Sequence, residues 1–407
     1  MKRPTSVILP EEASSTTPTP NRRLMRRYPL FTDMIADVES RVPKRIAGYF
    51  LSGADSEGGL AETTAAFQRI RLVPRYGVDL SQSSTAIELF GRTYAAPIGV
   101  APVGYTSAIW PGAERALAQA AQHANVPFIT STFAIERLEQ IITFAPDVAW
   151  FQLYALTNMA TSVDLMARAA RSGYKVLVVT IDIPVYSKRT RDYRTGLEFP
   201  PRVTPALLAE VARTPRWSLE YLKRSYPLPG NLMPYAADPG GGVAALRELL
   251  ARTEIRSLTW AELMDLRKAW PGKLVVKGIQ HPADAEAAVA AGADGIIVSN
   301  HGGRQFDAAP APIDSLPAVA AAVGSRATVM VDSGVRSGLD VAKALVRGAQ
   351  CAFAGRAFVA ACAAAGNAEV GAQHAMGLFF DETATALGQL GAATPAALIG
   401  DRAREWR

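Results

Sequence analysis

Short apolar runs recur along the chain at intervals that suit alternating strands and helices. Their lengths and their content of β-branched residues are typical of strands buried on both faces of a parallel sheet. Most of the segments between them are long enough for one crossover helix. The eight runs are Ala96–Pro102, Pro127–Ser131, Ala149–Tyr154, Val176–Asp182, Lys273–Ile279, Gly295–Asn300, Thr328–Ser333 and Cys351–Arg356.

Helical spacing of apolar residues appears between several runs, at Ala113–His123, Val163–Ser172, Pro282–Ala291 and Gly338–Arg347. Eight βα units predict an α/β fold of the (β/α)8 or TIM-barrel type. A doubly wound sheet is the alternative, but it usually has fewer strands and a glycine-rich loop after its first strand. No G-x-G-x-x-G motif is present, and Ala101–Gly104 follows the first run. The barrel is therefore favoured.

The gap after the fourth run is much longer than the others, with 90 residues before Lys273. Thr259–Trp270 is expected to be the barrel helix, so residues 188–258 form an insertion. Three interpretations stay open for it. It is a lid over the site, a loosely held surface loop, or a docking surface that presses Trp217 and Tyr221 onto a membrane.

The segment ahead of the barrel divides into two parts. Residues 1–27 are rich in Ser, Thr, Pro and Arg, which predicts a disordered basic arm. Residues 32–50 have helical spacing that ends at Ser52 and Gly53. We therefore assign residues 28–95 to an N-terminal helical segment that packs on the barrel, and residues 96–407 to the barrel itself.

Composition and charge narrow the function classes. The 407 residues are 49% hydrophobic and 20% charged, and no apolar run is long enough for a transmembrane helix. The absence of a secretory signal and the presence of only two cysteines predict a cytoplasmic protein without a metal site. Residues 188–229 carry a net charge of +5 and residues 1–30 carry +4, against +6 for the whole chain. This uneven charge disfavours nucleic-acid binding and leaves open peripheral contact with the inner face of a membrane.

Polar residues gather where the predicted strands end. In a barrel the carboxyl ends of all strands meet at one face, where active sites form. These residues therefore predict a ligand site at that face. They are Thr130, Ser131, Gln152, Tyr154, Thr180, Asp182, Lys277, Ser299 to Gln305, Asp332 to Gly334, Gly355 and Arg356.

Two features at this face indicate specific chemistry. His301 follows a strand, is the one histidine of four outside predicted helices or helix starts, and precedes two glycines and Arg304. An imidazole there suits general-base catalysis near neutral pH. Gly334–Arg336 and Gly355–Arg356 follow the seventh and eighth strands, where barrels often bind phosphate with glycine amides and a guanidinium group.

The run Ser299-Asn300-His301-Gly302-Gly303-Arg304-Gln305 resembles the signature of the FMN-dependent 2-hydroxy acid oxidases and dehydrogenases, which include glycolate oxidase and the lactate and mandelate dehydrogenases. The similarity extends from about residue 30 to the C-terminus. The other matching segments are Tyr49, Ser52–Ala54, Phe151–Tyr154, Thr180–Pro184, Arg189, Lys277–Ile279 and the two phosphate segments.

The resemblance implies a role for each catalytic and substrate-binding residue. His301 would be the base beside the substrate α-carbon, and Asp182 would stabilise the imidazolium formed there. Arg189 and Arg304 would bind the substrate carboxylate, Arg304 as a bidentate clamp. Tyr49 and Tyr154 would hydrogen-bond the substrate carboxylate or hydroxyl.

The resemblance also implies an FMN site. Lys277 would lie near the flavin N1/O2 edge and stabilise the reduced ring. Asp332 would bind ribityl hydroxyls, and the arginines of the last two strands would bind the phosphate. The complete implied cofactor set is Pro102, Val103, Gly104, Ser131, Gln152, Thr180, Lys277, Ser299, Asp332, Ser333, Gly334, Arg336, Gly355 and Arg356.

Three positions depart from common family patterns. Ser333 stands where glycine is more frequent, and Phe133 where glycolate oxidase has tryptophan. Gly104 stands where many oxidases have alanine, and in this respect the chain is similar to mandelate dehydrogenase and lactate monooxygenase. A missing methyl group at that wall favours a bulky or aromatic substrate and an acceptor other than oxygen.

The predicted function is FMN-dependent oxidation of a small or aryl (S)-2-hydroxy acid to the 2-oxo acid, with electrons passing to oxygen, a quinone or a protein. The resemblance implies a homo-oligomer, often a tetramer. Two alternatives stay open: another phosphate-binding barrel, such as an isomerase or an IMP dehydrogenase, and a non-catalytic scaffold. The IMP dehydrogenase alternative needs a loop cysteine, whereas Cys351 opens a strand and Cys362 lies in a predicted helix.

Overall fold

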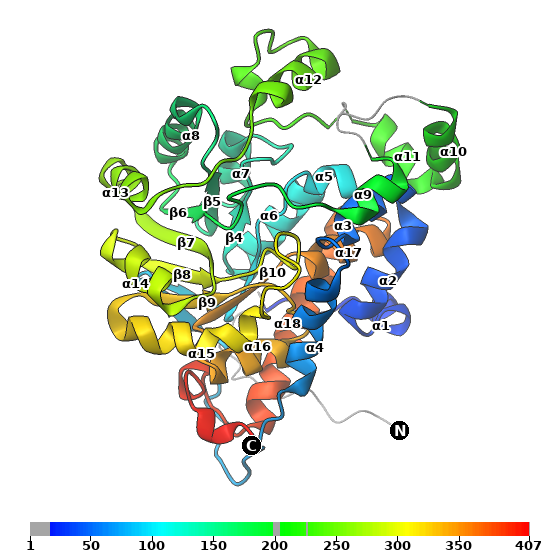
Figure 1. Ribbon diagram of the computed structural model, residues 1–407. Coiled ribbons are helices and arrows are strands. Elements are labelled where there is room, and N and C mark those ends of the chain that lie inside the picture. The colour runs from blue at the N-terminus through cyan, green and yellow to red at the C-terminus, as the bar shows by residue number, and fades with distance from the viewer. Residues whose placement is uncertain (1–16, 198–203, 225–226, 407) are drawn as a thin grey trace.

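The computed structural model describes residues 17–197, 204–224 and 227–406. Eight parallel strands form a closed barrel in which β10 pairs with both β9 and β3 (Figure 1). Each of the eight predicted runs contains one of these strands, so the predicted TIM barrel is confirmed. The strands are β3 Ile98–Val100, β4 Phe128–Thr130, β5 Ala149–Tyr154, β6 Val176–Thr180, β7 Lys273–Ile279, β8 Gly295–Val298, β9 Thr328–Val331 and β10 Cys351–Ala354.

The barrel strands are buried on both faces, as their nearly continuous apolar sequences require. At their amino ends a hairpin of β1 (Ile87–Leu89) and β2 (Arg92–Tyr94) closes the barrel. The ring of Phe90 lies 5.7 Å from that of Trp150, whose indole N–H donates to the Tyr94 hydroxyl over 3.1 Å. The expectation that residues 28–95 form a helical segment is therefore incomplete, because this segment also contributes a β-hairpin.

The predicted crossover helices are confirmed within a few residues at each end. Ala and other small residues on their inner faces allow close packing against the strands. The helices around and beyond the barrel are α5 Thr106–Ile109, α6 Ala113–Ala124, α7 Leu138–Phe144, α8 Met159–Ser172, α13 Trp260–Ala269, α14 Pro282–Ala290, α15 Pro312–Val323, α16 Gly338–Val346, α17 Arg356–Ala365 and α18 Ala368–Gln389.

The N-terminal region contains more helices than its sequence suggested. Residues 1–16 of the predicted arm lie outside the described residues, but Asn21 caps helix α1 (Arg22–Arg27), so disorder through residue 27 is wrong. The helical spacing over residues 32–50 corresponds to two helices, α2 (Phe31–Arg41) and α3 (Lys44–Leu51). Pro43 separates them, because the residue before a proline is driven out of the helical conformation. Helix α4 (Gly58–Arg69) follows.

The insertion after β6 is a packed helical excursion rather than a loose loop in its described part. It contains α9 (Thr190–Thr195), α10 (Pro205–Arg213), α11 (Pro215–Leu222), η1 (Met233–Tyr235) and α12 (Gly242–Arg252), which lie along one side of the molecule (Figure 1). The Trp217 indole donates to the Ile109 carbonyl over 3.0 Å, and Trp217 is only 8% exposed. The expectation that Trp217 faces a membrane is therefore wrong, because this side chain anchors α11 to α5.

Candidate active site

A cavity of about 270 Å³ opens at the carboxyl ends of the barrel strands. Most of the predicted site residues line it, although they come from segments as far apart as α3 and the end of β10. The predicted residues in its wall are Tyr49, Pro102, Val103, Gly104, Ser131, Tyr154, Arg189, Lys277, His301, Arg304, Asp332, Ser333, Gly334, Arg336, Gly355 and Arg356. Asp182, Gln152, Thr180 and Ser299 do not line the cavity but lie just behind the wall.

A histidine–carboxylate pair lies in the wall of this cavity. His301 Nδ1 is 2.9 Å from Asp182 Oδ1, and His301 Nε2 is 3.4 Å from the Tyr154 hydroxyl. The carboxylate fixes the proton on Nδ1, so Nε2 is the nitrogen that is free to accept a proton. This arrangement orients an imidazole base toward the cavity.

Burial lowers the pKa of His301 below its ordinary value, although the charge of Asp182 acts in the opposite direction. For Asp182, burial alone would raise the pKa, but the nearby His301 and Lys277 outweigh it and hold the pKa below its usual range. The pair is therefore a neutral imidazole beside an ionised carboxylate near neutral pH. That is the protonation state that a general base needs.

The glycines of the signature sequence are required by the backbone at this point. His301, Gly302 and Gly303 all have positive φ, at 58°, 69° and 74°. A Cβ at position 302 would lie 2.9 Å from Arg356 Nη1, and one at position 303 would lie 2.6 Å from Leu60 Cα. The two glycines thus allow the sharp turn that presents His301 to the cavity.

Two arginines stand on the same side of the cavity. Arg304 Nη1 donates to the carbonyl of Tyr49 over 2.7 Å and to that of Ser52 over 3.1 Å, and its guanidinium lies over the Tyr49 ring at 4.9 Å. Its Nε and Nη2 make no hydrogen bond to the described residues. Burial, followed by the charge of Arg189, lowers the pKa of Arg304 to about 10. Burial of Asp192 raises its pKa, while the charges of Arg189 and Arg304 act in the opposite direction, so this carboxyl is a nearby acidic group. Neither arginine makes an ion pair among the described residues, and two such cations at one wall favour a bound carboxylate.

Lys277 is held in a buried polar cluster. Its Nζ lies 3.0 Å from Asp332 Oδ2 and donates to Ser299 Oγ over 2.8 Å. Burial alone would lower the pKa of Lys277, but Asp332 and Asp182 outweigh it and raise the pKa above its ordinary value. Lys277 is therefore a fixed cation at the base of the cavity. Asp332 is its counter-ion in addition to the ribityl role that the resemblance implied.

The end of the cavity formed by the segments after β9 and β10 is cationic and shaped by small residues. Burial lowers the pKa of Arg336 to about 10. Burial, followed by the charges of Arg304 and Arg336, lowers the pKa of Arg356 well below its ordinary value. Ser333 has a φ of 73°, which explains why glycine is frequent at this position in the family. Its hydroxyl donates to Asp332 Oδ1 and accepts the Gly302 N–H, both over 2.9 Å, so the serine is tolerated. This end suits a phosphate dianion.

Behind the wall, three polar atoms are buried without a hydrogen-bond partner among the described residues: Gln152 Nε2, Thr180 Oγ1 and Asp182 Oδ2. Gln152 Oε1, in contrast, accepts from Ser131 Oγ over 3.2 Å. Buried polar groups normally find partners, so unmatched donors beside a cavity indicate a missing polar ligand. Together with the cationic end, they fit a ring that carries carbonyl and nitrogen acceptors and a phosphate-bearing chain.

The remaining wall of the cavity is mostly apolar, and several of its residues were not predicted from the sequence. The rings of Tyr105 and Phe133 lie 6.0 Å apart, and a Cβ at Gly104 would lie 3.3 Å from Phe133 Cβ. Tyr105 and Tyr186 follow strand ends closely and could have been found by that signal. Ile255 gave no such signal, because it lies at the end of the excursion, far in sequence from any strand end. An isolated β-bridge to Leu156 brings it to the cavity. The wall residues that the sequence did not indicate are Phe50, Tyr105, Ile183, Tyr186, Ile255, Phe353 and Ala354.

These features define a TIM barrel whose strand ends bring a histidine–carboxylate pair, a buried lysine and four arginines together at one cavity. The chain belongs to the FMN-dependent dehydrogenase family, whose model matches residues 38–405. The resemblance found in the signature sequence is thereby confirmed. It excludes the scaffold and the unrelated phosphate-binding barrels as alternatives.

Several relatives cover most of this chain. The L-lactate dehydrogenase of Caulobacter vibrioides is 38% identical over 83% of this chain and 88% of its own. The (S)-mandelate dehydrogenase of Pseudomonas putida is 33% identical over 87% of this chain and 88% of its own. The crystal structure of a monotopic membrane protein, (S)-mandelate dehydrogenase, matches with a TM-score of 0.86 at 32% identity, over 93% of this chain and 98% of the other.

Proposed function

We propose that this enzyme binds FMN and oxidises an (S)-2-hydroxy acid with a bulky or aromatic side chain to the 2-oxo acid. The observation that carries the proposal is that His301, held by Asp182, lines one cavity together with Arg189 and Arg304. Family membership and the names of the lactate and mandelate relatives support the same chemistry.

The chain's own residues account for binding and proton movement. Arg189 and Arg304 bind the carboxylate and orient the α-carbon toward His301 Nε2, which removes a proton. Asp182 stabilises the imidazolium that results. Lys277, Gln152 and Thr180 hold the cofactor ring, and Arg336 and Arg356 hold its phosphate. FMN, when bound, supplies a two-electron acceptor.

The size of the side-chain pocket supports an aryl substrate. Gly104 leaves open a volume that a methyl group would fill beside Phe133. The apolar or aromatic residues Tyr105, Phe133 and Ile255 line the same cavity. Aromatic rings pack favourably against such walls. We therefore propose that mandelate-like acids are better substrates than lactate.

Anaerobic mixing with a panel of 2-hydroxy acids tests this proposal. Purified enzyme should be yellow, release FMN on denaturation, and lose its flavin absorbance with (S)-mandelate faster than with (S)-lactate. A colourless protein, or one whose flavin no 2-hydroxy acid reduces, would refute the proposed function. Faster bleaching by lactate would refute only the aryl preference.

We also propose that α10 and α11 rest on the inner face of a membrane and bring the enzyme close to a quinone. Leu208, Leu219 and Leu222 are 58%, 57% and 82% exposed. Exposed cations flank them at Arg213, Arg216, Lys223 and Arg224. A surface of leucines among cations suits an anionic bilayer. The mandelate dehydrogenase that shares this fold is described as monotopic.

The two acids of these helices do not oppose such contact, because both are paired. Glu210 Oε1 lies 3.3 Å from Arg45 Nε, and Glu220 contacts Lys223 and Arg224 over 2.7 and 2.9 Å. Among the described residues, no helix is both long and apolar enough to cross a bilayer. Contact is thus proposed through the surface of α10 and α11.

Sedimentation with phosphatidylglycerol vesicles at low salt tests the docking. The double variant Leu219→Asn/Leu222→Asn should lose binding, while Leu339→Asn, which changes an exposed leucine outside the excursion, should retain it. If the native enzyme does not bind these vesicles at low salt, where charge attraction is strongest, docking is refuted.

A homotetramer, which the family resemblance implies, also stays a prediction. Light scattering of the purified enzyme tests it.

A further inference from the structure

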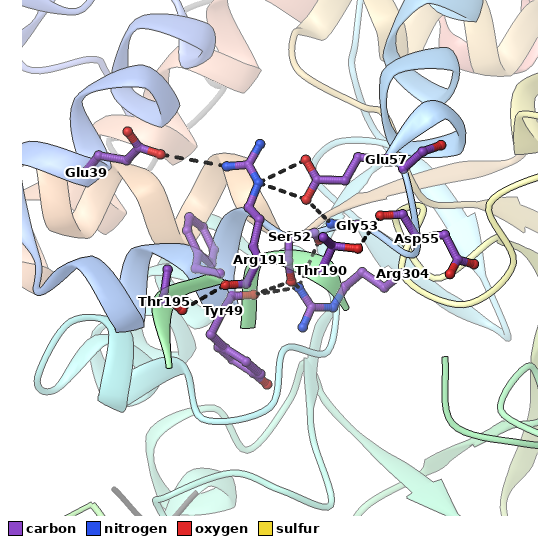
Figure 2. A network of polar contacts seen from close by, with 12 residues as sticks. Glu39, Tyr49, Ser52, Gly53, Asp55, Glu57, Thr190, Arg191, Thr195 and Arg304 are labelled. Atoms are coloured by element: carbon purple, nitrogen blue, oxygen red, sulfur yellow. Dashed lines mark hydrogen bonds and ion pairs between the residues drawn. The ribbon is translucent and has the colours of Figure 1, made fainter. Parts of the chain in front are cut away.

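Helix α9 is attached to the turn between α3 and α4 by an ion pair, drawn in Figure 2. Arg191 Nε donates to both carboxylate oxygens of Glu57, over 2.8 and 2.9 Å. Glu57 Oε1 also accepts the Gly53 N–H over 3.1 Å, so the carboxylate belongs to the structure of the turn. Arg191 Nη1 lies 3.7 Å from Glu39 of α2.

Backbone and packing contacts seat the same helix. The Asp55 N–H donates to the Lys188 carbonyl over 2.8 Å, and the Thr190 hydroxyl donates to the Asp55 carbonyl. At the other end of α9, a Cβ at Gly48 of α3 would lie 2.9 Å from Thr195 Cγ2. Helix α9 is therefore held at both ends against α3 and the turn that follows it.

Arg189 depends on this attachment. It lies immediately before α9 and lines the cavity, yet in the described parts of the chain its guanidinium makes no hydrogen bond or ion pair. No hydrogen bond or ion pair within those parts fixes the side chain itself, and its neighbour in charge, Asp192, belongs to α9 as well. The location of Arg189 therefore follows from α9 and the backbone between Lys188 and Arg191. Arg191 does not line the cavity, and its guanidinium lies between the carboxylates of Glu39 and Glu57 (Figure 2).

The turn that holds α9 also holds Arg304. The carbonyls of Tyr49 and Ser52 accept from Arg304 Nη1, and the Ala54 N–H donates to the Gly303 carbonyl over 2.8 Å. One turn thus sets the separation of two arginines that come from different strands of the barrel. Cations this close repel each other, and the structure that carries them must resist that force.

We propose that the Arg191–Glu57 pair is a latch that positions Arg189 relative to Arg304 for the substrate carboxylate. Arg191 is then a positioning residue that never contacts the substrate. The inference rests on the proposed function, because it assumes that the two arginines bind a carboxylate. Hydrogen bonds between a guanidinium group and a planar carboxylate depend strongly on geometry, so a small displacement of Arg189 weakens substrate binding.

Arg191→Met is the first test, with Arg194→Met as its matched control. Arg194 is an exposed arginine on the same helix, so both variants remove one positive charge from α9. Arg191→Met should raise KM for the best 2-hydroxy acid about tenfold, the effect of one misplaced charge-assisted hydrogen bond, with kcat changed less than about twofold. FMN affinity should be unchanged in both variants, and Arg194→Met should behave as the wild type.

The 2-hydroxy amide of the same side chain separates positioning from a general structural role. It lacks the carboxylate, so the latch predicts that Arg191→Met leaves its KM unchanged. Equal losses for the acid and the amide would overturn the inference, as would an unchanged KM for the acid. If the wild type neither binds nor oxidises any 2-hydroxy acid, the proposed function itself fails.

A double-mutant cycle with Glu57→Gln tests the pair. Glu57→Gln keeps an oxygen for the Gly53 N–H and removes the charge that Arg191 needs. The double variant should be no worse than either single variant, because both disrupt one interaction. Arg191→Lys should recover part of the loss. Fully additive effects would overturn the latch.

Discussion

Replacing Asp182 with asparagine tests the central electrostatic argument for this site. The amide oxygen of Asn can still accept the His301 Nδ1 proton at the present distance of 2.9 Å, so the orientation of the ring should survive. The negative charge beside the imidazole is lost. The variant therefore separates the electrostatic role of Asp182 from its orienting role.

The magnitude follows from the geometry of the pair. The two side chains are 18% and 12% exposed, so solvent screens them only in part. At a separation near 4 Å and an effective dielectric constant near 20, two unit charges interact by about 4 kcal/mol. Loss of most of this stabilisation of the imidazolium should slow proton removal by roughly two to three orders of magnitude.

The pH dependence has a definite sign. The rate rises with pH as His301 loses its proton, because only the neutral imidazole accepts the substrate proton. Burial lowers the pKa of His301 and Asp182 opposes that shift, so the loss of the carboxylate moves the pKa lower still. In Asp182→Asn the inflection in kcat/KM should therefore move to lower pH while the plateau falls.

Anaerobic stopped-flow measurement of flavin bleaching across this pH range provides the assay. FMN content and the circular dichroism spectrum should match those of the wild type, which shows that folding is intact. The reasoning would be refuted by an inflection that moves to higher pH. It would also be refuted by a plateau within about threefold of the wild type, since a lost buried charge cannot have so small an effect.

Three further substitutions probe the base, the carboxylate clamp and the pocket. His301→Ala should retain FMN and lose flavin reduction by roughly three orders of magnitude, as measured in a single anaerobic turnover. Arg304→Lys should raise KM sharply at unchanged FMN content, because an ammonium group cannot replace Nε and Nη2 together, and an unchanged KM for every acid would contradict the clamp. Gly104→Ala should lower kcat/KM for mandelate-like acids about tenfold and leave short-chain acids nearly unaffected, because the new methyl group narrows the wall beside Phe133.

The sequence by itself determined the barrel and the chemistry at its rim. Runs such as Gly295–Val298 are continuously apolar because strands of a parallel barrel are buried on both faces, so they stand out without any tertiary information. Their carboxyl ends must meet at one face, which brought His301 and Arg356 into one predicted site. Gly302 and Gly303 both have positive φ, which favours glycine, and these two glycines are part of the run that was recognised from sequence alone.

Features set by contacts between distant segments were decided only by the tertiary structure. Trp217 has the composition of a membrane anchor, but its partner is the carbonyl of Ile109, more than a hundred positions earlier. Ile255 reaches the cavity because the excursion returns beside Leu156, and no periodicity records that return.

The same limit applies to the pairing of charges. Arg191 and Glu57 are ordinary surface residues by sequence, and only the packing of α9 on the turn after α3 brings them together. Local pattern reflects the burial and backbone conformation of each segment. The choice of partner depends on how the chain closes in space, which no single segment specifies.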